Sequence, residues 1–360
     1  MKQYTKEWAS DLLGEMSYIL LTTPGEKHKL STRVRIDTRF INELTHKPIN
    51  ANPMKIHLGT SSWNFDEWRG VFYPDKMTAK DFLPYYAGKF NSVEVNTSFY
   101  ALPRPSTVEG WMQNVPPGFT FSLKMPRAIS HDKKLVHCAE ETLGFLEIQR
   151  LLGDMAGPGF LQLPPHFTRE RFGKVLADYL DWLGVELQKA ENAQIRLAVE
   201  VRADDLQTPA FAKFVAERGL ALVLGDRIIP DESRPPGPAG KLAPDLFDDW
   251  MALIEAGAAP TFTLIRWIGD NRDSVWAGPE DRNRKFVFAR DERLDLWAHR
   301  LTALHGAGIE IFGYMHNPYE GHAPISLDRL RQRLEPLMAL PAWPPEGWVD
   351  APPEQLLLFE

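Results

Sequence analysis

Charged and amide side chains recur where short apolar segments of this chain end. They occur in the segments SVEVN, FSLK, FLQLPP, AVEVR, LVLGD and TLIR. The set comprises Glu94, Asn96, Lys124, Gln162, Glu200, Arg202, Asp226 and Arg266. Carboxylates, amides and cations that converge in one place can bind an anionic group and transfer protons. We therefore predict a polar pocket with a cationic wall, suited to a phosphate or carboxylate group.

The alternation of residue types indicates which side chains enter that pocket. In SVEVN, Val93 and Val95 face one side of a strand, and Glu94 faces the other. We expect the apolar set to face outer helices and the polar set to face the interior, and AVEVR to follow the same pattern. An alternative needs no ligand: the carboxylates and cations neutralise one another in a structural network. Buried ionisable groups are costly unless they pair or bind something, and either arrangement meets that requirement.

Proton transfer is assigned to three side chains. Glu200, expected to be buried beside Arg202, is the first candidate for a carboxylate acid or base, and Glu94 joins it. His131 follows the third apolar segment, and the ordinary histidine pKa lies near neutrality. A solvated loop histidine is the alternative for His131. We expect Glu94, Asn96 and Gln162 to orient the substrate.

Aromatic residues and metal ligands are further candidate components of the site. The aromatics Trp63, Trp68, Phe72, Tyr73 and Tyr100 gather in the first two loops, where they stack on a ligand ring or pack a loop. Packing is favoured for Trp68 and Phe72. Three carboxylates with His131 or His316 offer ligands for a divalent cation, but no H-E-x-x-H spacing is present and the nearby Lys and Arg side chains repel a cation. We predict no cofactor, with a divalent metal as the weaker alternative.

The elements that position these residues alternate between strand and helix patterns. The expected strands are KIHLGTSS, SVEVNTSFY, FTFSLK, GFLQLPP, RLAVEVR, LALVLGD, TFTLIRW and IEIFGYMHN. Amphipathic segments such as RERFGKVLADYLDWL lie between most of them. Eight such units predict an α/β fold, a (β/α)8 TIM-like barrel whose site lies at the carboxyl ends of the strands. A doubly wound sheet is the fallback, but HLGTSSWNF lacks its glycine-rich loop.

The chain divides into three parts in this interpretation. Residues 1–53 form an N-terminal extension with a helix over about residues 6–21, residues 54–340 form the barrel, and residues 341–360 form a proline-rich C-terminal tail. Residues 227–245 interrupt the sixth unit as a loop or lid near the mouth. A net charge of -7 argues against a general electrostatic grip on nucleic acid or anionic lipid. With one cysteine, no apolar run of membrane-spanning length and no signal peptide, we expect a cytoplasmic protein without membrane contact.

Several longer motifs resemble one known family. The segments GTSSWNFDEWRGVFYP, VEVNTSFYALPRPSTVEGW, FTFSLKMPRAISH, FLQLPPHF and AVEVR are similar, in order, to the domain-of-unknown-function 72 family, also called YecE-like. The resemblance runs from about Ile56 to Pro324. It implies a TIM-barrel-like fold and no particular reaction.

The chain also departs from the pattern of that family. Ala203 and Leu206 stand where the family usually has histidine and tryptophan, and Ile268 stands where it has histidine. The last strand of the family usually ends in two asparagines, and here His316 and Asn317 fill those positions. We count both among the substrate-binding candidates. A pocket altered in this way is expected to take a different substrate or to bind without turnover.

The chain ends on the peptide QLLLF, residues 355–359. It is similar to the Q-L-x-L-F peptides with which bacterial polymerases and repair proteins dock on the replication sliding clamp. The partner-binding candidates are Gln355, Leu356, Leu358 and Phe359. An amide anchor followed by large apolar side chains suits a groove, and the proline-rich segment before it suits a tether. The alternative is that this run covers an apolar patch of the barrel.

Three functions remain open from the sequence. The first is a hydrolase or lyase that binds an anionic substrate, DNA among the candidates, and is brought to the clamp by the tail. The second is a non-catalytic adaptor for a phosphorylated ligand or a nucleic-acid end. The third is a small-molecule enzyme that acts on a sugar or carboxylate and has a structural tail.

Overall fold

Parallel strands with helices between them organise the part of the chain that the structure describes. The computed structural model describes residues 56–229, 233, 240–270 and 281–348. The predicted N-terminal helix and the QLLLF peptide lie outside these residues. The parallel strands are β1 (Ile56–Ser61), β2 (Ser92–Val95), β3 (Thr120–Leu123), β4 (Gly159–Gln162), β5 (Leu197–Glu200), β6 (Ala221–Ile229), β8 (Phe262–Gly269) and β9 (Glu310–Met315).

The strands follow one another around a barrel. Their order is β3-β2-β1-β9-β8-β6-β5-β4, and β1 pairs with β9 so that the first and last strands of the described residues are neighbours. Isolated parallel bridges join the two ends of this path, at Phe121 with Ala156 and at Lys124 with Phe160. The amide of Met125 also donates to the carbonyl of Phe160 at 2.9 Å. The predicted (β/α)8 TIM-like barrel is therefore confirmed, in a nearly closed form.

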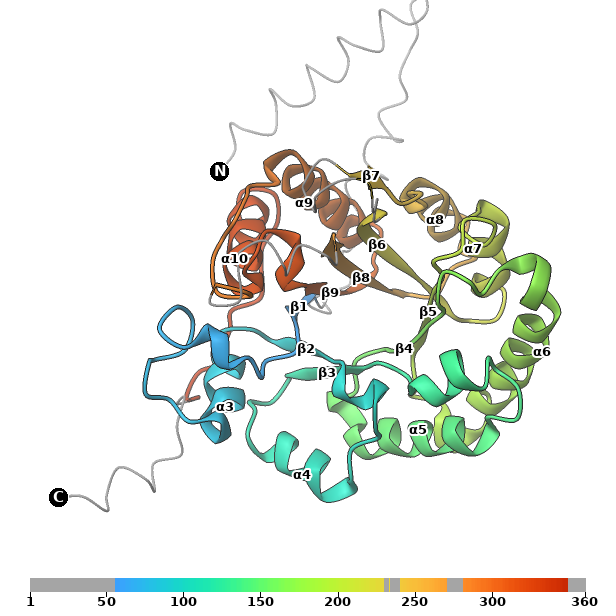
Figure 1. Ribbon diagram of the computed structural model, residues 1–360, viewed down its shortest axis with the longest axis horizontal. Coiled ribbons are helices and arrows are strands. Elements are labelled where there is room, and N and C mark those ends of the chain that lie inside the picture. Colours follow the sequence, from blue (N-terminus) through green and yellow to red (C-terminus); the bar gives the residue numbers. More distant parts are fainter. Residues whose placement is uncertain (1–55, 230–232, 234–239, 271–280, 349–360) are drawn as a thin grey trace, which may run out of the picture. The chain divides into compact units, whose positions relative to one another are not determined.

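A helix follows each of these strands, and Figure 1 shows the helices as a ring outside the strands. They are α3 (Phe82–Ala87), α4 (Pro105–Gln113), α5 (Ala139–Leu152), α6 (Arg169–Leu187), α7 (Pro209–Ala216), α8 (Phe247–Glu255), α9 (Asp291–Gly306) and α10 (Ala323–Leu334). Within the ranges just given, no helix is both long and apolar enough to cross a membrane.

Local sequence explains where the helices begin and which face they bury. Thr168 accepts a side-chain hydrogen bond from the amide of Arg171 and so caps α6, and Thr208 caps α7 with Pro209 in its first turn. In α6, Leu176, Leu180 and Leu183 are buried at helical spacing and belong to the hydrophobic core.

The sixth unit differs from the loop or lid that the sequence predicts. Strand β6 continues beyond the barrel to Ile229, and β7 (Lys241–Leu242) pairs antiparallel with Ile228 and Ile229. The described ends of the interrupting segment thus form a short β-ladder. The proline-rich centre of the segment, apart from Ser233, lies outside the described residues.

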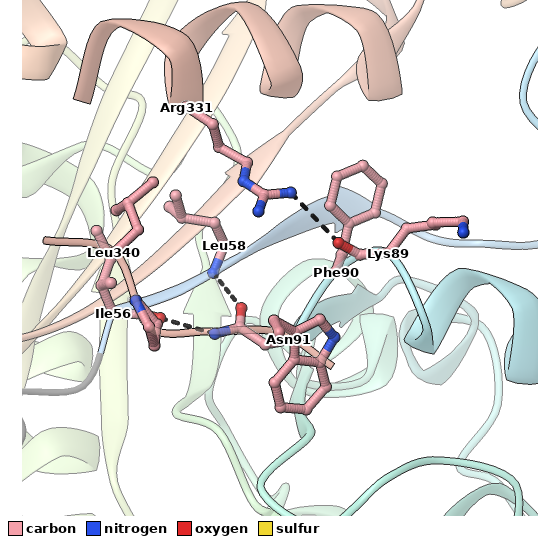
Figure 2. A pocket seen from close by; sticks show the side chains of 9 residues that line it. Ile56, Leu58, Lys89, Phe90, Asn91, Arg331 and Leu340 are labelled. Atoms are coloured by element: carbon pink, nitrogen blue, oxygen red, sulfur yellow. Dashed lines mark hydrogen bonds between the residues drawn. The ribbon is translucent and has the colours of Figure 1, made fainter. Parts of the chain in front are cut away.

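The amino end of β1 is held by side chains rather than by strand pairing alone. Asn91 bonds the backbone of β1 twice, since its Oδ1 accepts from the Leu58 amide at 2.8 Å and its Nδ2 donates to the Ile56 carbonyl at 2.8 Å. Arg331 of α10 donates to the Lys89 carbonyl at 3.3 Å (Figure 2). This end of the barrel lies opposite the loops that follow the strands, where stability is the usual role.

The first residues of the predicted tail lie against the barrel. Trp343 is partly buried, its Nε1 donates to the Ala87 carbonyl at 2.8 Å, and its ring lies 6.4 Å from that of Phe119. The boundary at residues 340 and 341 stays a prediction.

Candidate functional site

A cavity of about 310 Å3 opens at the carboxyl ends of the strands. Its lining comes from β2, β3, β4, β5, β8 and β9 or from the residues that directly follow them. The lining residues are Asn96, Phe99, Tyr100, Lys124, Gln162, Arg202, Arg266, Ile268 and His316. Six of these nine were predicted as substrate-binding residues, and the barrel brings them together from distant parts of the sequence.

Strand register explains why these side chains meet. Parallel partners in register point to the same side of the sheet, and Gln162 pairs with Glu200 while Gly225 pairs with Arg266. Glu94 pairs with Ser61 and belongs to the same interior face. The alternation inferred for SVEVN and AVEVR therefore holds, because the polar members of both strands face the interior.

A buried ion-pair network forms the floor of the cavity. The Arg266 side chain is 3% exposed and donates from Nε and Nη2 to the Glu94 carboxylate at 2.7 and 2.8 Å. Its Nη1 donates to Glu200 Oε2. Arg202 donates from Nε to the other oxygen of Glu200 at 2.8 Å. The pairing network considered as an alternative thus exists for these four residues, and the guanidinium of Arg266 is held between two carboxylates.

Asn96 extends this network toward the mouth. Its Nδ2 donates to Glu94 Oε1 at 2.8 Å and to Ser61 Oγ at 2.6 Å. Both donor hydrogens of the amide therefore have partners, and its Oδ1 is the remaining group for a ligand at the cavity.

The network fixes the charge of both glutamates. Burial raises the pKa of Glu200, but the charges of Arg266 and Arg202 outweigh it and hold that pKa well below the usual range. Burial also raises the pKa of Glu94, but Arg266 and His316 outweigh it and hold that pKa well below the usual range. A carboxylate held in this way is a weak base near pH 7. The geometry thus favours a structural and positioning role for Glu200 and Glu94 over the predicted proton transfer.

Lys124 follows β3 and enters the cavity beside this network. Its Nζ donates to Gln162 Oε1 at 2.9 Å and lies 4.0 Å from the centroid of the Phe99 ring. Within the described residues, no carboxylate lies within ion-pair distance of Nζ. Burial, followed by the charge of Arg266, lowers the pKa of Lys124 to about 8. The amine is therefore cationic near pH 7 with a minor neutral fraction.

Arg202 is a second cation of the site that has donors available to a ligand. Its side-chain hydrogen bond to Glu200 uses Nε, and within the described ranges neither Nη atom has a protein acceptor. Its side chain is 16% exposed at the cavity. A guanidinium with two parallel N–H groups available matches the geometry of a carboxylate or phosphate.

The two predicted histidines differ in position. His316 lines the cavity, with Nε2 at 3.5 Å from Glu94 Oε1, and burial lowers its pKa. His131 lies in the single-turn helix η4 (Ala128–Asp132), where its Nδ1 is 2.8 Å from Ser130 Oγ and its ring lies nearly perpendicular to that of Phe99, with the centroids 5.0 Å apart. Burial, followed by the charge of Lys124, lowers the pKa of His131 to about 4. Both rings are thus neutral near pH 7.

Asp226 and Asn317 were predicted to bind substrate, but the structure does not place them at this cavity. Gly225 shares the register of Arg266, so Asp226, one residue later, faces outward. Its Oδ2 accepts from Arg293, Trp297 and Tyr319. Asn317 Oδ1 accepts from the Ala323 amide at the start of α10. Both side chains support helix packing.

The aromatic lining differs in part from the prediction. Tyr100 lies at the cavity and is 80% exposed, whereas Trp68 is fully buried among loop aromatics, as the packing interpretation states. Phe99 also lines the cavity but is not among the predicted site residues, and it does not lie in a strand, although a strand is predicted over all of SVEVNTSFY. The strand ends at Val95, and Phe99 lies in the short helix η3 (Thr97–Phe99).

The side chains that could bind a metal ion do not form a cluster in the described part of the chain. Over residues 56–229, 233, 240–270 and 281–348, no group of three or more His, Cys, Asp or Glu side chains is placed to hold a metal ion. The carboxylates nearest the cavity bind arginines instead.

Comparison with known proteins agrees with the resemblance of the motifs. The family model described as "Protein of unknown function DUF72" matches residues 57–347. The UPF0759 protein YecE of Escherichia coli K12 is 28% identical over 308 residues, which cover 84% of this chain and all of that protein. A DUF72 family structure from Thermotoga maritima has a TM-score of 0.60 at 24% identity and covers 78% of this chain and 99% of its own. One from Enterococcus faecalis has 0.56 at 20%, with 81% and 98% covered. The two structures show the same fold.

Proposed function

The chain belongs to the DUF72 family, and on that premise we propose that its barrel mouth binds a small phosphate- or carboxylate-bearing substrate as the active site of an enzyme. The proposal rests on one observation. The cavity and its floor hold three cationic side chains, Lys124, Arg202 and Arg266, against two carboxylates, Glu94 and Glu200. The excess positive charge faces the cavity through Lys124 and Arg202, which suits an anion.

The size of the cavity favours a small molecule over a nucleic-acid duplex. A volume of 310 Å3 lies at the lower end of the range of about 300–1,000 Å3 typical of small-molecule sites. The net charge of -7 also favours a localised anion site over a broad polyanion surface. The end of a nucleic-acid strand fits the same chemistry and remains within the substrate class that we propose.

The proposed roles follow from the hydrogen bonds. Arg202 binds the anionic group, Asn96 and Gln162 orient the ligand, and Arg266 is held by Glu94 and Glu200 as a fixed cation in the floor. Proton transfer falls first to Lys124, because its pKa of about 8 lies nearest to pH 7, and the ring of His316 at the cavity is the second candidate. The lowered pKa of His131, about 4, makes its ring a weak base near pH 7.

Binding of sulfate as a function of pH tests the anion site. Sulfate keeps a constant charge over the range used, so a change in affinity reports the protein. Because the protonated amine of Lys124 attracts the anion and its pKa is about 8, the affinity is expected to be constant below that pH and to fall above it. Losing one charge-assisted hydrogen bond predicts a decrease of about tenfold or more by about pH 10, measured by calorimetric titration.

The variant Lys124→Gln serves as the control for this titration. It is expected to bind sulfate more weakly at neutral pH and to show little dependence on pH in the same range. A pH profile of the intact protein that matches the profile of this variant would contradict the assignment of Lys124 to the anion site.

A second candidate is a non-catalytic adaptor for a phosphorylated ligand. The observation that favours it is the engagement of both carboxylates, Glu94 and Glu200, by Arg266. An adaptor releases its ligand unchanged. An enzyme converts some member of a panel of phosphorylated and carboxylated metabolites, and the Lys124→Gln variant is expected to abolish that conversion.

We also propose that the C-terminal peptide docks on a bacterial sliding clamp, which requires a cytoplasmic location. The proposal rests on the sequence QLLLF at residues 355–359 alone. We expect binding in the micromolar range, typical of short linear peptides, and loss of that binding when residues 355–360 are deleted. Pull-down and calorimetry with purified clamp measure it. Failure to bind, together with a lower melting temperature of the truncated chain, would instead assign the peptide to the packing of the barrel.

A further inference from the structure

The amine of Lys124 is placed unusually for a lysine at an anion site. It follows β3, and its backbone is fixed on both sides, since its amide donates to the Val95 carbonyl at 3.2 Å and its carbonyl accepts from Ser98 Oγ at 2.7 Å. The side chain therefore projects into the cavity from a rigid position. A reactive group on a rigid element is held in one geometry, as chemistry on a bound ligand requires.

The carboxylates that a buried lysine would normally pair with are occupied. Arg266 binds both oxygens of Glu94 and one oxygen of Glu200, and Arg202 binds the other oxygen of Glu200. Nζ of Lys124 contacts an amide oxygen and an aromatic face instead. Since these are neutral groups, they hold the amine in place without fixing its positive charge as strongly as a carboxylate would.

Gln162 has one orientation in this arrangement. Its Nε2 donates to the Leu163 carbonyl at 2.9 Å, and this bond directs Oε1 toward Lys124. The Phe99 ring, whose centroid lies 4.0 Å from Nζ, also limits the movement of the amine. The open side of Nζ thus faces the cavity that Arg202 also lines.

The charges around the amine of Lys124 also favour its neutral form. Burial and the cations Arg266 and Arg202 favour the neutral amine, and they outweigh the opposing effect of Glu200 and Glu94. The nearby His131 is held neutral by burial and adds no positive charge near pH 7. A lysine desolvated beside other cations is the usual environment of an amine that acts as a nucleophile.

We infer that Lys124 is a nucleophile that forms a Schiff base with the carbonyl carbon of a 2-oxo carboxylate whose carboxylate group binds Arg202. This inference rests on the proposed anion site and adds a substrate class to it. The class follows from the lining, because the same cavity offers a guanidinium, whose Nη atoms have no acceptor among the described residues, and an amine. A carbonyl adjacent to a carboxylate presents both groups to these two side chains at once.

The step is balanced without any further reactant. The neutral amine attacks the carbonyl carbon, the carbonyl oxygen takes up a proton, and the carbinolamine loses water. Overall, the ammonium of Lys124 and the carbonyl compound yield a protonated imine and one water molecule. The oxygen of that water comes from the carbonyl group and its two hydrogens come from the ammonium. The resulting imine cation withdraws electrons from the adjacent carbon, which is the basis of lyase chemistry on such substrates.

Reductive trapping of the full-length protein with pyruvate and sodium cyanoborohydride tests this inference. Hydride from cyanoborohydride converts the imine into a stable secondary amine, and mass spectrometry of peptides locates the adduct. We expect Lys124 to be modified at least about tenfold faster than the exposed Lys174 near pH 7.5, because an ordinary exposed lysine has a pKa of about 10.4. Sulfate is expected to slow the modification of Lys124 and to leave that of Lys174 unchanged.

The variant Lys124→Arg is the matched control, since it keeps a cation at the position and removes the primary amine. It is expected to lose the fast adduct and to retain slow modification at surface lysines. Equal rates at Lys124 and Lys174 in the folded protein, or a fast adduct that persists in Lys124→Arg, would overturn the inference.

The outcomes separate this inference from the anion site beneath it. Sulfate binding without preferential trapping at Lys124 refutes the nucleophile and leaves the anion site in place. Preferential trapping that sulfate does not slow supports the nucleophile and refutes the shared anion site. If neither sulfate binding nor preferential trapping is observed, both proposals are refuted.

Discussion

Replacing Arg266 by methionine is expected to lower the free energy of unfolding by about 3–5 kcal/mol, the largest effect that the structure predicts for a single substitution at the site. Glu94 and Glu200 are almost fully buried and are compensated mainly by this guanidinium. The variant leaves two buried carboxylates close together with one side-chain cation fewer. Denaturant unfolding monitored by circular dichroism measures the loss.

The loss is expected to shrink as the pH falls. In the intact protein, the pKa values of Glu94 and Glu200 lie below the unfolded value of about 4.3, so their stabilising contribution is present above that pH and is lost below it. Without Arg266, burial and mutual repulsion raise both pKa values, and the two groups destabilise the fold above the unfolded value. The difference between variant and intact protein is thus largest near neutrality and smaller below about pH 4.

Two further variants keep this prediction testable if Arg266→Met fails to fold. The triple variant Glu94→Gln, Glu200→Gln, Arg266→Met replaces charged groups by neutral ones and is expected to recover much of the lost stability. The surface variant Arg333→Met removes contacts to Asp291 and Asp295 and is expected to cost about 1 kcal/mol or less. Equal stability of Arg266→Met and Arg333→Met would contradict the buried network.

Replacing Arg202 by glutamine is expected to weaken sulfate binding about 10–100-fold. Loss of hydrogen bonds from a charged donor costs about 1.5–3 kcal/mol, and each 1.4 kcal/mol corresponds to a factor of ten. Glu200 keeps its bond to Arg266 in this variant, and the Arg202 side chain is partly exposed, so the fold is expected to persist. Calorimetric titration with sulfate at neutral pH measures the affinity, and circular dichroism checks the fold.

Arg127→Gln is the matched control for charge near the mouth. Arg127 directly precedes η4 and pairs with Asp132, but it does not line the cavity. The control variant is expected to bind sulfate with an affinity within about twofold of the intact protein, because an exposed charge is screened. Equal losses in the two variants would mean that sulfate responds to the general field of the barrel mouth and not to a site at Arg202.

The fold could be predicted from the sequence because apolar residues recur with clearly different periods in the strands and in the helices. Val93 and Val95 against Glu94, and Val199 and Val201 against Glu200, set the inner and outer faces of β2 and β5. Once eight such strands are arranged as a barrel, their carboxyl ends must meet, and most of the predicted lining residues therefore share one cavity.

Asp226 shows where that reasoning fails. The segment LALVLGD is apolar at nearly every position, so its sequence does not reveal which residues face inward. The register with β8 decides the question, since it places Gly225 inside beside Arg266 and turns Asp226 toward Trp297. Asn317 was predicted from the family pattern instead. It lies beyond the end of β9 at Met315, in the short helix η8 (Asn317–Tyr319), where its Oδ1 accepts from the Ala323 amide.

The partners of the charged residues also required the structure. The sequence placed Glu200 beside Arg202 and named Arg266 as a cation of the site. It did not determine that Arg266 takes both carboxylates and leaves the amine of Lys124 with Gln162 and Phe99. That choice depends on side-chain geometry across the barrel, which the local sequence pattern does not encode.

The location of a bound anion is the most direct test of the central claim, that the barrel mouth binds a small anion through Arg202 and Lys124. Tungstate is a tetrahedral analogue of phosphate, and anomalous diffraction from tungsten locates it in crystals of the full-length protein. We predict one site in the cavity with oxygens at about 2.7–3.2 Å from Arg202 Nη atoms and Lys124 Nζ. Tungstate bound only elsewhere on the protein, with the cavity empty of it, would contradict the account.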